Sequence, residues 1–179
     1  MLEDLSHHIL DIAENGVNAG ASAITIELED DEYIRLTVKD NGRGMDESTA
    51  RSVVDPFYTT RTERRVGLGL PFLKQLAELC GGKFLLRSSP GKGTDVSATF
   101  RKDSVDTPPL GDIPSTLLTL LVGNPQIAWR YIHRVGNREF VLDSEELAEA
   151  LGGGNPFADA ALAVGIKEFI ATNIEELSV

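Results

Sequence analysis

The stretch DNGRGM, residues 40–45, is the point around which this 179-residue chain is organised. The residues before it, 33–39, alternate between polar and apolar side chains, a period of two that predicts a half-buried strand. The residues after it, 46–51, are typical of the capped first turn of a helix. An Asn-Gly pair often forms a β-hairpin turn, but a hairpin needs a second strand where this polar helix start stands. We therefore predict a binding loop between a strand and a helix.

The side chains of this loop suggest what it could bind. An ionised carboxylate at Asp40 accepts hydrogen bonds and donates none, so it suits a ligand with an amino group, such as adenine. Gly42 and Gly44 lack side chains and allow the backbone to approach a flat ligand closely.

The composition is that of a soluble globular protein, with 41% hydrophobic and 25% charged residues. The net charge of -11 argues against nucleic acid as a partner, because binding to a phosphate backbone needs a basic face. This charge is uneven, since residues 1–102 carry -3 and residues 103–179 carry -8. The only cysteine, Cys80, excludes an internal disulfide and stands in an apolar run, which indicates a buried thiol.

The N-terminal sequence lacks the basic and apolar pattern of a signal peptide. The apolar runs are also shorter than the roughly 20 residues that span a bilayer. We therefore expect a cytoplasmic protein with no membrane partner.

Residues 2–19 place apolar side chains at three- and four-residue steps, which predicts an amphipathic helix that ends at Gly20. A second stripe of this helix is polar and contains Asp11, Asn15 and Asn18. A polar helix face is usually just solvated. This stripe has no Lys or Arg, however, and its short oxygen-bearing side chains would suit a hard cation such as Mg²⁺.

A polar stretch without periodicity, residues 55–66, follows the helix predicted after the 40–45 loop and is interpreted as a mobile lid. Its arginines, Arg61, Arg64 and Arg65, would suit the phosphate tail of ATP, and they would equally suit an ordinary exposed loop. Next comes Gly67-Leu68-Gly69-Leu70 at the start of a predicted helix, where backbone N–H groups and the helix dipole could bind an anion.

Strands are also expected at residues 23–28, 83–88 and 94–100. With the helices predicted between them, residues 1–102 form an α/β (α+β) two-layer sandwich with a mostly antiparallel sheet.

Four spaced elements within residues 5–101 together resemble the GHKL superfamily, the ATP-binding fold of gyrase B subunits, ninety-kilodalton chaperones, histidine kinases and mismatch-repair ATPases. The resemblance is closest to histidine-kinase catalytic domains, through PFYTTR at 56–61, GLGL at 67–70 and GKGT at 91–94. It implies a Bergerat-type sheet with helices on one face, and ATP and Mg²⁺ as cofactors.

The resemblance also implies roles for single residues. Asn15 would bind, through its side-chain oxygen, a Mg²⁺ ion that bridges the ATP phosphates, and Asp40 would accept a hydrogen bond from the adenine amine. Met45 would lie against the base, and the hydroxyl of Thr94 would complete the adenine site. The other residues implied to bind the nucleotide are Gly42, Gly44, Thr60, Arg61, Gly67, Leu68, Gly69 and Leu70.

Asp11 departs from the histidine-kinase pattern. It stands one helical turn before Asn15, where gyrase-like ATPases carry a glutamate general base and many histidine kinases carry asparagine. A carboxylate there could orient or deprotonate an attacking water or hydroxyl, although it is one methylene shorter than glutamate. Asp11 is therefore the candidate catalytic residue. Glu14 points about 100° away from Asn15 around the helix and is a weaker candidate.

Histidine kinases place their phosphoacceptor histidine on a helical hairpin upstream of the asparagine helix, and this sequence has no such hairpin before Asn15. His7 and His8 share that helix, and we expect them to be ordinary surface or boundary residues. Phosphoryl transfer would then act in trans, on a separate partner protein.

Residues 103–113 have the composition of a linker, and residues 114–179 lie outside the resemblance. Their pattern predicts a helix at 114–122, a β-hairpin at 127–142, a helix capped by Ser144 and a last helix at 156–177. We expect a C-terminal αβ appendage that binds a partner or forms a homodimer. The alternative is that it completes the core of the first domain.

Three functions remain open on the sequence alone. The first is an ATP-dependent protein kinase acting in trans, which the lid sequence favours. The second is an ATP-gated switch or slow ATPase without a phosphoacceptor, which Asp11 favours. The third is an interaction protein that nucleotide stabilises without turnover.

Overall fold

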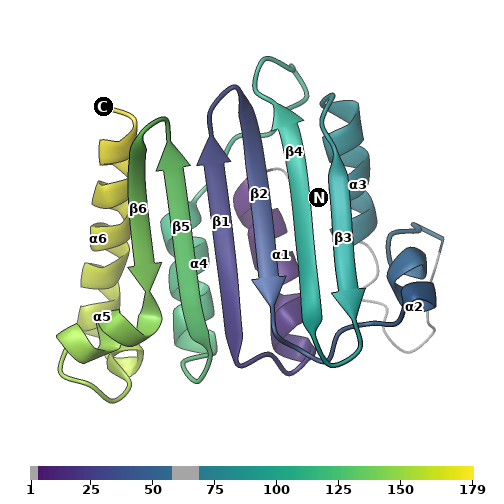
Figure 1. The fold of residues 1–179 in the computed structure, drawn as a ribbon. Helices are drawn as coiled ribbons and strands as arrows, with labels where there is room; N and C mark the ends of the chain where they lie inside the picture. The colour runs from purple at the N-terminus through teal and green to yellow at the C-terminus, as the bar shows by residue number, and fades with distance from the viewer. Residues whose placement is uncertain (1–3, 58–68) are drawn as a thin grey trace.

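A six-stranded sheet forms the centre of the computed structural model, which describes residues 4–57 and 69–179 (Figure 1). The strand order is β3-β4-β2-β1-β5-β6, and every neighbouring pair is antiparallel except β1 and β5, which run parallel. The strands are β1 (Ala23–Asp30), β2 (Tyr33–Asp40), β3 (Phe84–Ser89), β4 (Gly93–Arg101), β5 (Ala128–Val135) and β6 (Arg138–Asp143).

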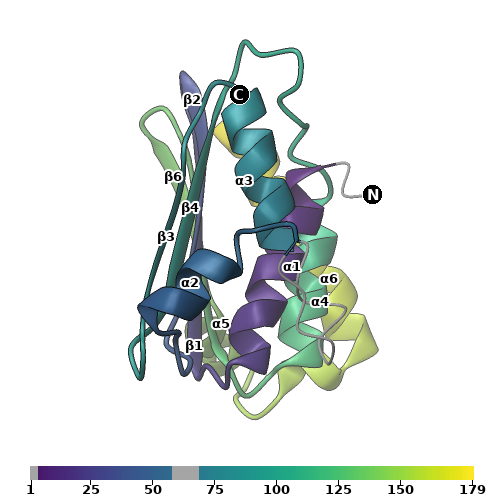
Figure 2. The same ribbon diagram turned by 90° about the vertical axis from the view of Figure 1, so that its right-hand side faces the viewer.

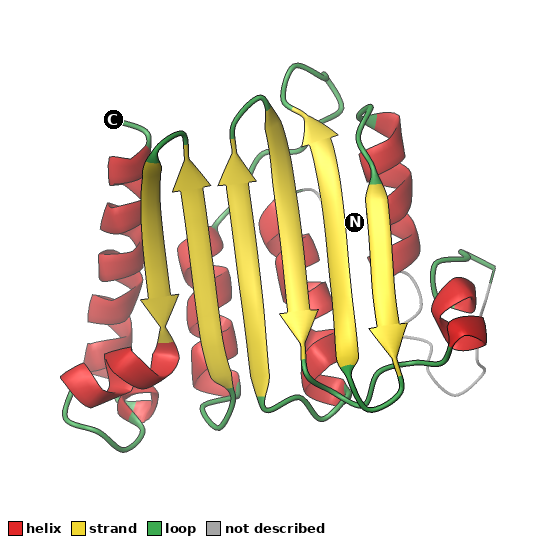
Figure 3. Ribbon diagram, viewed as in Figure 1, coloured by secondary structure: helices red, strands yellow, loops and turns green. Residues whose placement is uncertain are grey.

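The long helices cover one face of this sheet and leave the other face open (Figures 2 and 3). The result is the predicted two-layer α/β sandwich with a mostly antiparallel sheet. The helices are α1 (Leu5–Asn18), α2 (Glu47–Ser52), α3 (Gly69–Leu79), α4 (Ile113–Gly123), α5 (Ser144–Ala150) and α6 (Ala160–Leu177), with a 3-10 turn, η1, at Pro156–Ala158.

The period-two pattern of β1 explains which face of the sheet is covered. Ile24, Ile26 and Leu28 are buried, while the residues between them are half-buried. Because successive side chains in a strand point to opposite faces, one row of β1 packs under the helices and the other row faces the open side.

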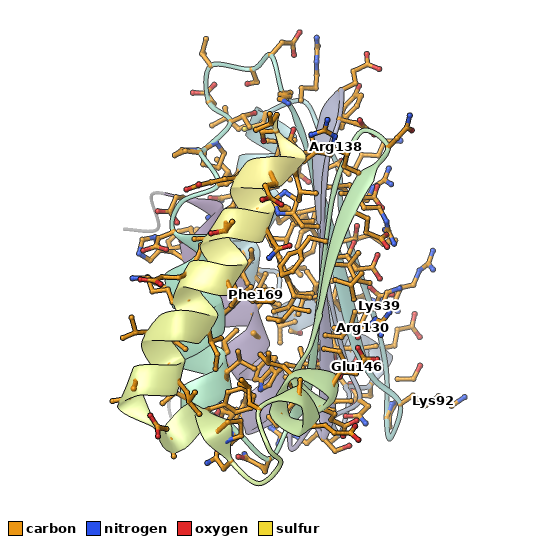
Figure 4. All side chains as sticks on the ribbon, turned by 90° about the vertical axis from the view of Figure 1, so that its left-hand side faces the viewer. Lys39, Lys92, Arg130, Arg138, Glu146 and Phe169 are labelled. Carbon is orange, nitrogen blue, oxygen red and sulfur yellow. The ribbon has the colours of Figure 1, made fainter. Side chains whose placement is uncertain are left out.

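The open face of the sheet is charged. Arg134 on β5 forms ion pairs with Glu139 on β6, at 2.6 Å, and with Glu29 on β1, at 3.3 Å. Lys39 and Arg130 point away from the helices on this side of the molecule (Figure 4). Exposed ion pairs of this kind contribute little to stability, so this face is mainly a solvated surface.

Residues 114–179 continue the sheet and the core of residues 1–102. β5 pairs with β1 along its whole length, and Trp129, Tyr131 and Phe140 belong to the same buried cluster as Ile24 and Ile26. The packing therefore agrees with the alternative stated above, in which residues 114–179 complete the core of residues 1–102. A partner-binding or dimerising role for this segment stays a prediction.

The expected linker, 103–113, is bonded to the N-terminus of α1. The carbonyls of Pro109 and Leu110 accept hydrogen bonds from the backbone N–H groups of Leu5 and Ser6, at 3.0 and 2.9 Å. The first N–H groups of a helix have no partner within the helix. The linker therefore supplies partners for two of them.

Two helix starts in the C-terminal segment differ from the prediction. Asp143, and not Ser144, is the N-cap of α5, and it accepts hydrogen bonds from Glu145 N and Glu146 N. The last helix begins at Ala160 and not at Pro156, because Asp159 caps it and the residues before it form the 3-10 turn. Within the described ranges, none of the helices combines the length and apolar character needed to cross a bilayer.

Candidate functional site

A pocket of about 440 Å³ lies where α1, the loop after β2 and the start of β4 meet. It brings together six residues that the sequence selected, namely Asn15, Asp40, Gly44, Met45, Leu70 and Thr94. These residues come from segments far apart in the chain. The sheet register explains part of this convergence, because the end of β2 pairs with the start of β4, with Asp40 opposite Thr94.

Asp40 is the last residue of β2 and lines the pocket, and its two carboxylate oxygens differ in their contacts. Its Oδ1 accepts a hydrogen bond from Gly42 N at 2.8 Å, which holds the turn of the loop. Within the described part of the chain, its Oδ2 makes no hydrogen bond. An acceptor-only oxygen is therefore available to a ligand in the pocket.

The rest of the loop is held on both sides. Arg43 N donates to Ala19 O at 2.9 Å, and the Arg43 guanidinium donates to Asn18 O at 3.0 Å, so the loop is fixed to the last turn of α1. On the other side, Gly91 N in the β3–β4 turn donates to Arg43 O at 2.6 Å. Hydrogen bonds to the end of α1 and to the β3–β4 turn thus hold the loop from two sides.

Gly44 requires glycine for two reasons. Its φ of 68° lies in the left-handed region that side chains disfavour. A Cβ at this position would also overlap the carbonyl oxygen of Ser89. The next residue, Met45, donates its N–H to the hydroxyl of Ser88 at 2.8 Å, so β3 fixes the end of the loop.

Asn15 lines the pocket from the third turn of α1. Within residues 4–57 and 69–179, its side-chain amide has no hydrogen-bond partner. The side-chain oxygen of Asn15 is therefore free to bind a ligand or a cation.

Asp11 lies one turn before Asn15, next to the N-terminus of α3 and outside the lining of the pocket. It packs so closely against Gly69 that a Cβ there would overlap its Oδ2. Burial raises the pKa of the Asp11 carboxyl, and the charge of Glu14 raises it further. A carboxyl with a raised pKa is a better proton acceptor once it is ionised, as a general base requires.

The other predicted site residues have different outcomes. Gly42 is buried and supports Asp40 from outside the pocket lining. Thr60, Arg61, Gly67 and Leu68, together with most of the expected lid at 55–66, lie outside the described residues.

Sequence reasoning missed the apolar wall of the pocket. Ile12, Ala19, Val53 and Val96 all line it. Ile12 and Val96 could have been found, because they stand three residues before Asn15 in a helix and two residues after Thr94 in a strand, on the same faces as those residues. Val53 had no such signal, because it follows α2 in a non-repetitive segment.

His7 and His8 of α1 differ in exposure. His7 is exposed, as expected, and contacts Asp4 at 2.9 Å. The expectation that His8 is a surface or boundary residue is wrong, since His8 is only 2% exposed. Burial lowers the pKa of His8, which is therefore neutral and inaccessible to a phosphoryl donor.

Comparison with known proteins shows the family to which residues 2–104 belong. Residues 2–104 match the family described as histidine kinase-, DNA gyrase B- and HSP90-like ATPase. Sporulation kinase E of Bacillus subtilis (strain 168) is 33% identical over 94 residues, which cover 50% of this chain and 13% of that protein. Sensor histidine kinase YcbM of the same organism is 30% identical over 108 residues, which cover 56% of this chain and 35% of that protein.

The fold likeness reaches beyond residue 104. The crystal structure of the N terminal domain of a DNA repair protein matches 84% of this chain and 57% of that chain, with a TM-score of 0.56 and 15% identity. At this identity the match concerns the fold alone. It includes part of the C-terminal segment, so strands or helices beyond the family match belong to a fold that recurs elsewhere.

The family match covers more than half of the chain, and the free acceptors of Asn15 and Asp40 lie in one pocket of the matched region. This chain therefore belongs to the histidine kinase-, DNA gyrase B- and HSP90-like ATPase family, and it is a histidine-kinase-like ATP-binding module of that family.

Proposed function

We propose that this protein binds ATP together with Mg²⁺ and transfers the terminal phosphate to a separate partner protein, or controls that partner through its nucleotide state. The observation that carries the proposal is the pocket, which collects Asn15, Asp40 and Thr94 around one cavity. The kinase names of the related proteins support phosphoryl transfer as the activity. The segments matched make up only 13% to 35% of the two Bacillus relatives described above, so their whole activities are not carried over to this chain.

The pocket suits a purine base. Asp40 offers a carboxylate oxygen to an exocyclic amine. Ile12, Met45 and Val96 supply apolar contact for the faces of a flat ring. A site with apolar walls and few oriented polar groups is the usual form of a small-molecule pocket.

The described residues also fit a magnesium ion that the nucleotide brings with it. They contain no group of three or more His, Cys, Asp or Glu side chains placed to hold a metal. Mg²⁺ in nucleotide sites takes most of its ligands from phosphates and water, with one or two from the protein. The unpaired side-chain oxygen of Asn15 is suited to be such a ligand, and the ion would neutralise the phosphate charge.

Isothermal titration calorimetry with a non-hydrolysable ATP analogue, with and without Mg²⁺, tests this assignment. The wild type should bind more tightly with Mg²⁺, and Asn15→Ala should lose that gain, about tenfold or more in affinity. Asn18→Ala is the matched control, because Asn18 is exposed one turn further along α1 and contributes only its backbone carbonyl to the loop. Mg²⁺-dependent binding that persists in Asn15→Ala would contradict the assignment.

Phosphoryl transfer needs its own test. The full chain is incubated with ATP labelled at the terminal phosphate and with candidate partner proteins, and the label is followed. Labelling of a partner that disappears in Asn15→Ala and persists in Asn18→Ala supports a kinase acting in trans. A chain that binds ATP and labels none of the partners tested favours the switch.

A slow ATPase is the second candidate, and Asp11 favours it. Its carboxyl lies one turn from Asn15 and has a raised pKa. If Asp11 activates water, phosphate release should fall about 100-fold or more in Asp11→Asn, because general base catalysis typically contributes factors of this size. ATP affinity should stay within a few-fold of the wild type. Equal phosphate release by the two proteins would exclude this role.

A further inference from the structure

Ser88 is a half-buried residue of β3 whose hydroxyl joins three groups at the rim of the pocket. It lies 2.8 Å from Met45 N, 3.0 Å from Gly93 O and 2.9 Å from the hydroxyl of Thr94. The register of the sheet places it directly opposite Thr94 on β4. Ser88 does not line this pocket, and its hydroxyl contacts two residues that do, Met45 and Thr94.

With all three contacts formed as hydrogen bonds, the chemistry of the groups determines the direction of each bond. A backbone N–H only donates and a backbone carbonyl only accepts, whereas a hydroxyl has a single hydrogen to donate. Ser88 therefore accepts from Met45 N and donates its hydrogen to Gly93 O. The third bond then requires Thr94 to be the donor and Ser88 the acceptor.

This assignment leaves Thr94 with only lone pairs for the pocket. Its neighbour across the β2–β4 pair is Asp40, whose free carboxylate oxygen is also an acceptor. The polar edge of the pocket thus presents two acceptors side by side. A ligand satisfies them with the hydrogens of an amino group, directly or through an ordered water.

We propose that Ser88 is a positioning residue that determines base specificity, because it holds the Thr94 hydroxyl as an acceptor and thereby selects purines with an amino group at position 6, as in adenine, over purines with a carbonyl there, as in guanine. This inference rests on the proposed binding of ATP. A purine with a carbonyl at the same position would place a third acceptor against Thr94 and Asp40 and leave polar groups unpaired. Sites discriminate strongly when the wrong ligand leaves buried polar groups without partners.

The prediction concerns a ratio of affinities and not ATP affinity itself. In Ser88→Ala the Thr94 hydroxyl loses its acceptor, can rotate and can donate to a carbonyl in the pocket. The ratio of ATP to GTP affinity should therefore fall about tenfold, the effect of gaining or losing one hydrogen bond in a buried site. A purely structural role for Ser88 would weaken both nucleotides equally and leave the ratio unchanged.

The experiment measures both affinities by titration calorimetry on the full chain. Ser89→Ala is the matched control, because Ser89 is the exposed neighbour on the same strand and its side chain makes no hydrogen bond within the described ranges. It should keep the wild-type ratio. Ser88→Thr retains a hydroxyl and should restore most of the preference.

Thr94→Val completes a double-mutant cycle. It removes the hydroxyl altogether, so it should lower the ratio by itself, and adding Ser88→Ala should then change the ratio no further. If Ser88→Ala fails to fold, Thr94→Val still tests the premise of the proposal, because an unchanged ratio in this variant would show that the Thr94 hydroxyl does not select the base. An unchanged ratio in Ser88→Ala, or a further fall in the double variant, overturns the role of Ser88 while ATP binding stands. A wild type that binds neither nucleotide overturns the proposed function itself.

Discussion

At the first residue of α3, Gly69 touches the carboxylate of Asp11, and a side chain at this position would overlap Oδ2. Gly165 in α6 provides a contrast, because a Cβ there would meet no atom within 4 Å apart from its chain neighbours and the backbone of its own helix. The two glycines share a helical setting and differ in the space around them. The same substitution should therefore have opposite effects at the two sites.

Gly69→Ala should lower the free energy of unfolding by about 1–3 kcal/mol, the usual cost of forcing extra volume into a packed site. Gly165→Ala should raise it by about 0.5–1 kcal/mol, because glycine inside a helix is entropically unfavourable relative to alanine. Urea denaturation of the two variants and the wild type measures both values. Stabilisation by Gly69→Ala would show that Asp11 can move aside freely.

His8 makes stability depend on pH. It is 2% exposed, neither ring nitrogen has a partner within the described ranges, and burial lowers its pKa in the folded state. The unfolded chain, with an ordinary histidine pKa of about 6.5, therefore binds more protons below that pH. The histidine contribution to stability is present above pH 6.5 and is lost as the pH falls toward the folded-state pKa. Burial lowers the pKa of His133 in the same way, although the charge of Asp30 opposes this.

The free energy of unfolding should thus decrease between about pH 7.5 and pH 5.5. In His8→Phe the decrease should be smaller, and in the double variant with His133→Phe it should be smallest. Urea denaturation at several pH values measures the slope. A double variant that keeps the wild-type slope would show that other groups cause it.

At the scale of elements, the turn from β6 into α5 shows how one strand fixes the start of a helix. Ser144 is buried, and its hydroxyl accepts a hydrogen bond from Trp129 N on β5 at 2.8 Å. Its side chain is therefore engaged with the neighbouring strand, and the capping of α5 passes to Asp143. The Ser144–Trp129 hydrogen bond depends on the β5–β6 pairing, which brings the start of α5 next to β5.

Asp143→Ala should lower the free energy of unfolding by about 1 kcal/mol, the typical cost of losing an N-cap. Asp143→Asn keeps a side-chain oxygen and should cost much less. Thermal or urea unfolding of the two variants provides the comparison. Equal losses in both would mean that the ion pair of Asp143 with Arg130, at 3.5 Å, contributes more than the cap.

Local patterns were sufficient to predict most elements, because their cause is local. The amphipathic period of α1 and the alternation in β1 and β2 depend only on neighbouring residues. The cap of α5 could not be predicted, because Ser144 and Asp143 are equally good capping residues and a partner on another strand decides between them. The burial of His8 was missed for the same reason, since its burial depends on packing from other elements.

The site residues also separate into those with a local signature in the sequence and those whose role depends on contacts between distant segments. The 40–45 loop was identified because its glycines and acid have local signatures, and Gly44 does adopt the backbone conformation that favours glycine. Ser88 was not identified. Its role arises from bonds to residues 43 positions before it and six positions after it, which only the paired sheet brings together.

For the whole molecule, residues 1–102 and 103–179 differ in sequence character but share one sheet and one buried core. β1 lies in the interior of the sheet only because β5 pairs with it. The N-terminus of α1 also takes two of its hydrogen-bond acceptors from Pro109 and Leu110. Removing the second part would therefore expose a sheet edge and leave two N–H groups of α1 unpaired.

A chain that stops at residue 102 should consequently aggregate or unfold at a much lower temperature than the full chain, because an open edge strand offers unpaired backbone groups for association. Size-exclusion chromatography with light scattering and thermal unfolding test this. A monomeric fragment with cooperative unfolding near the temperature of the full chain would show that residues 1–102 are an independent domain.

The pairing of β1 with β5 also sets an order of events during synthesis. Ala23 pairs with Ala128, so about 100 residues must be translated after β1 before its partner exists, which takes roughly 5–20 s at common rates. Throughout this interval the nascent chain carries a strand with one unpaired edge. Slowing or speeding translation between these strands should therefore change the yield of folded protein, even though the finished amino-acid sequence is identical.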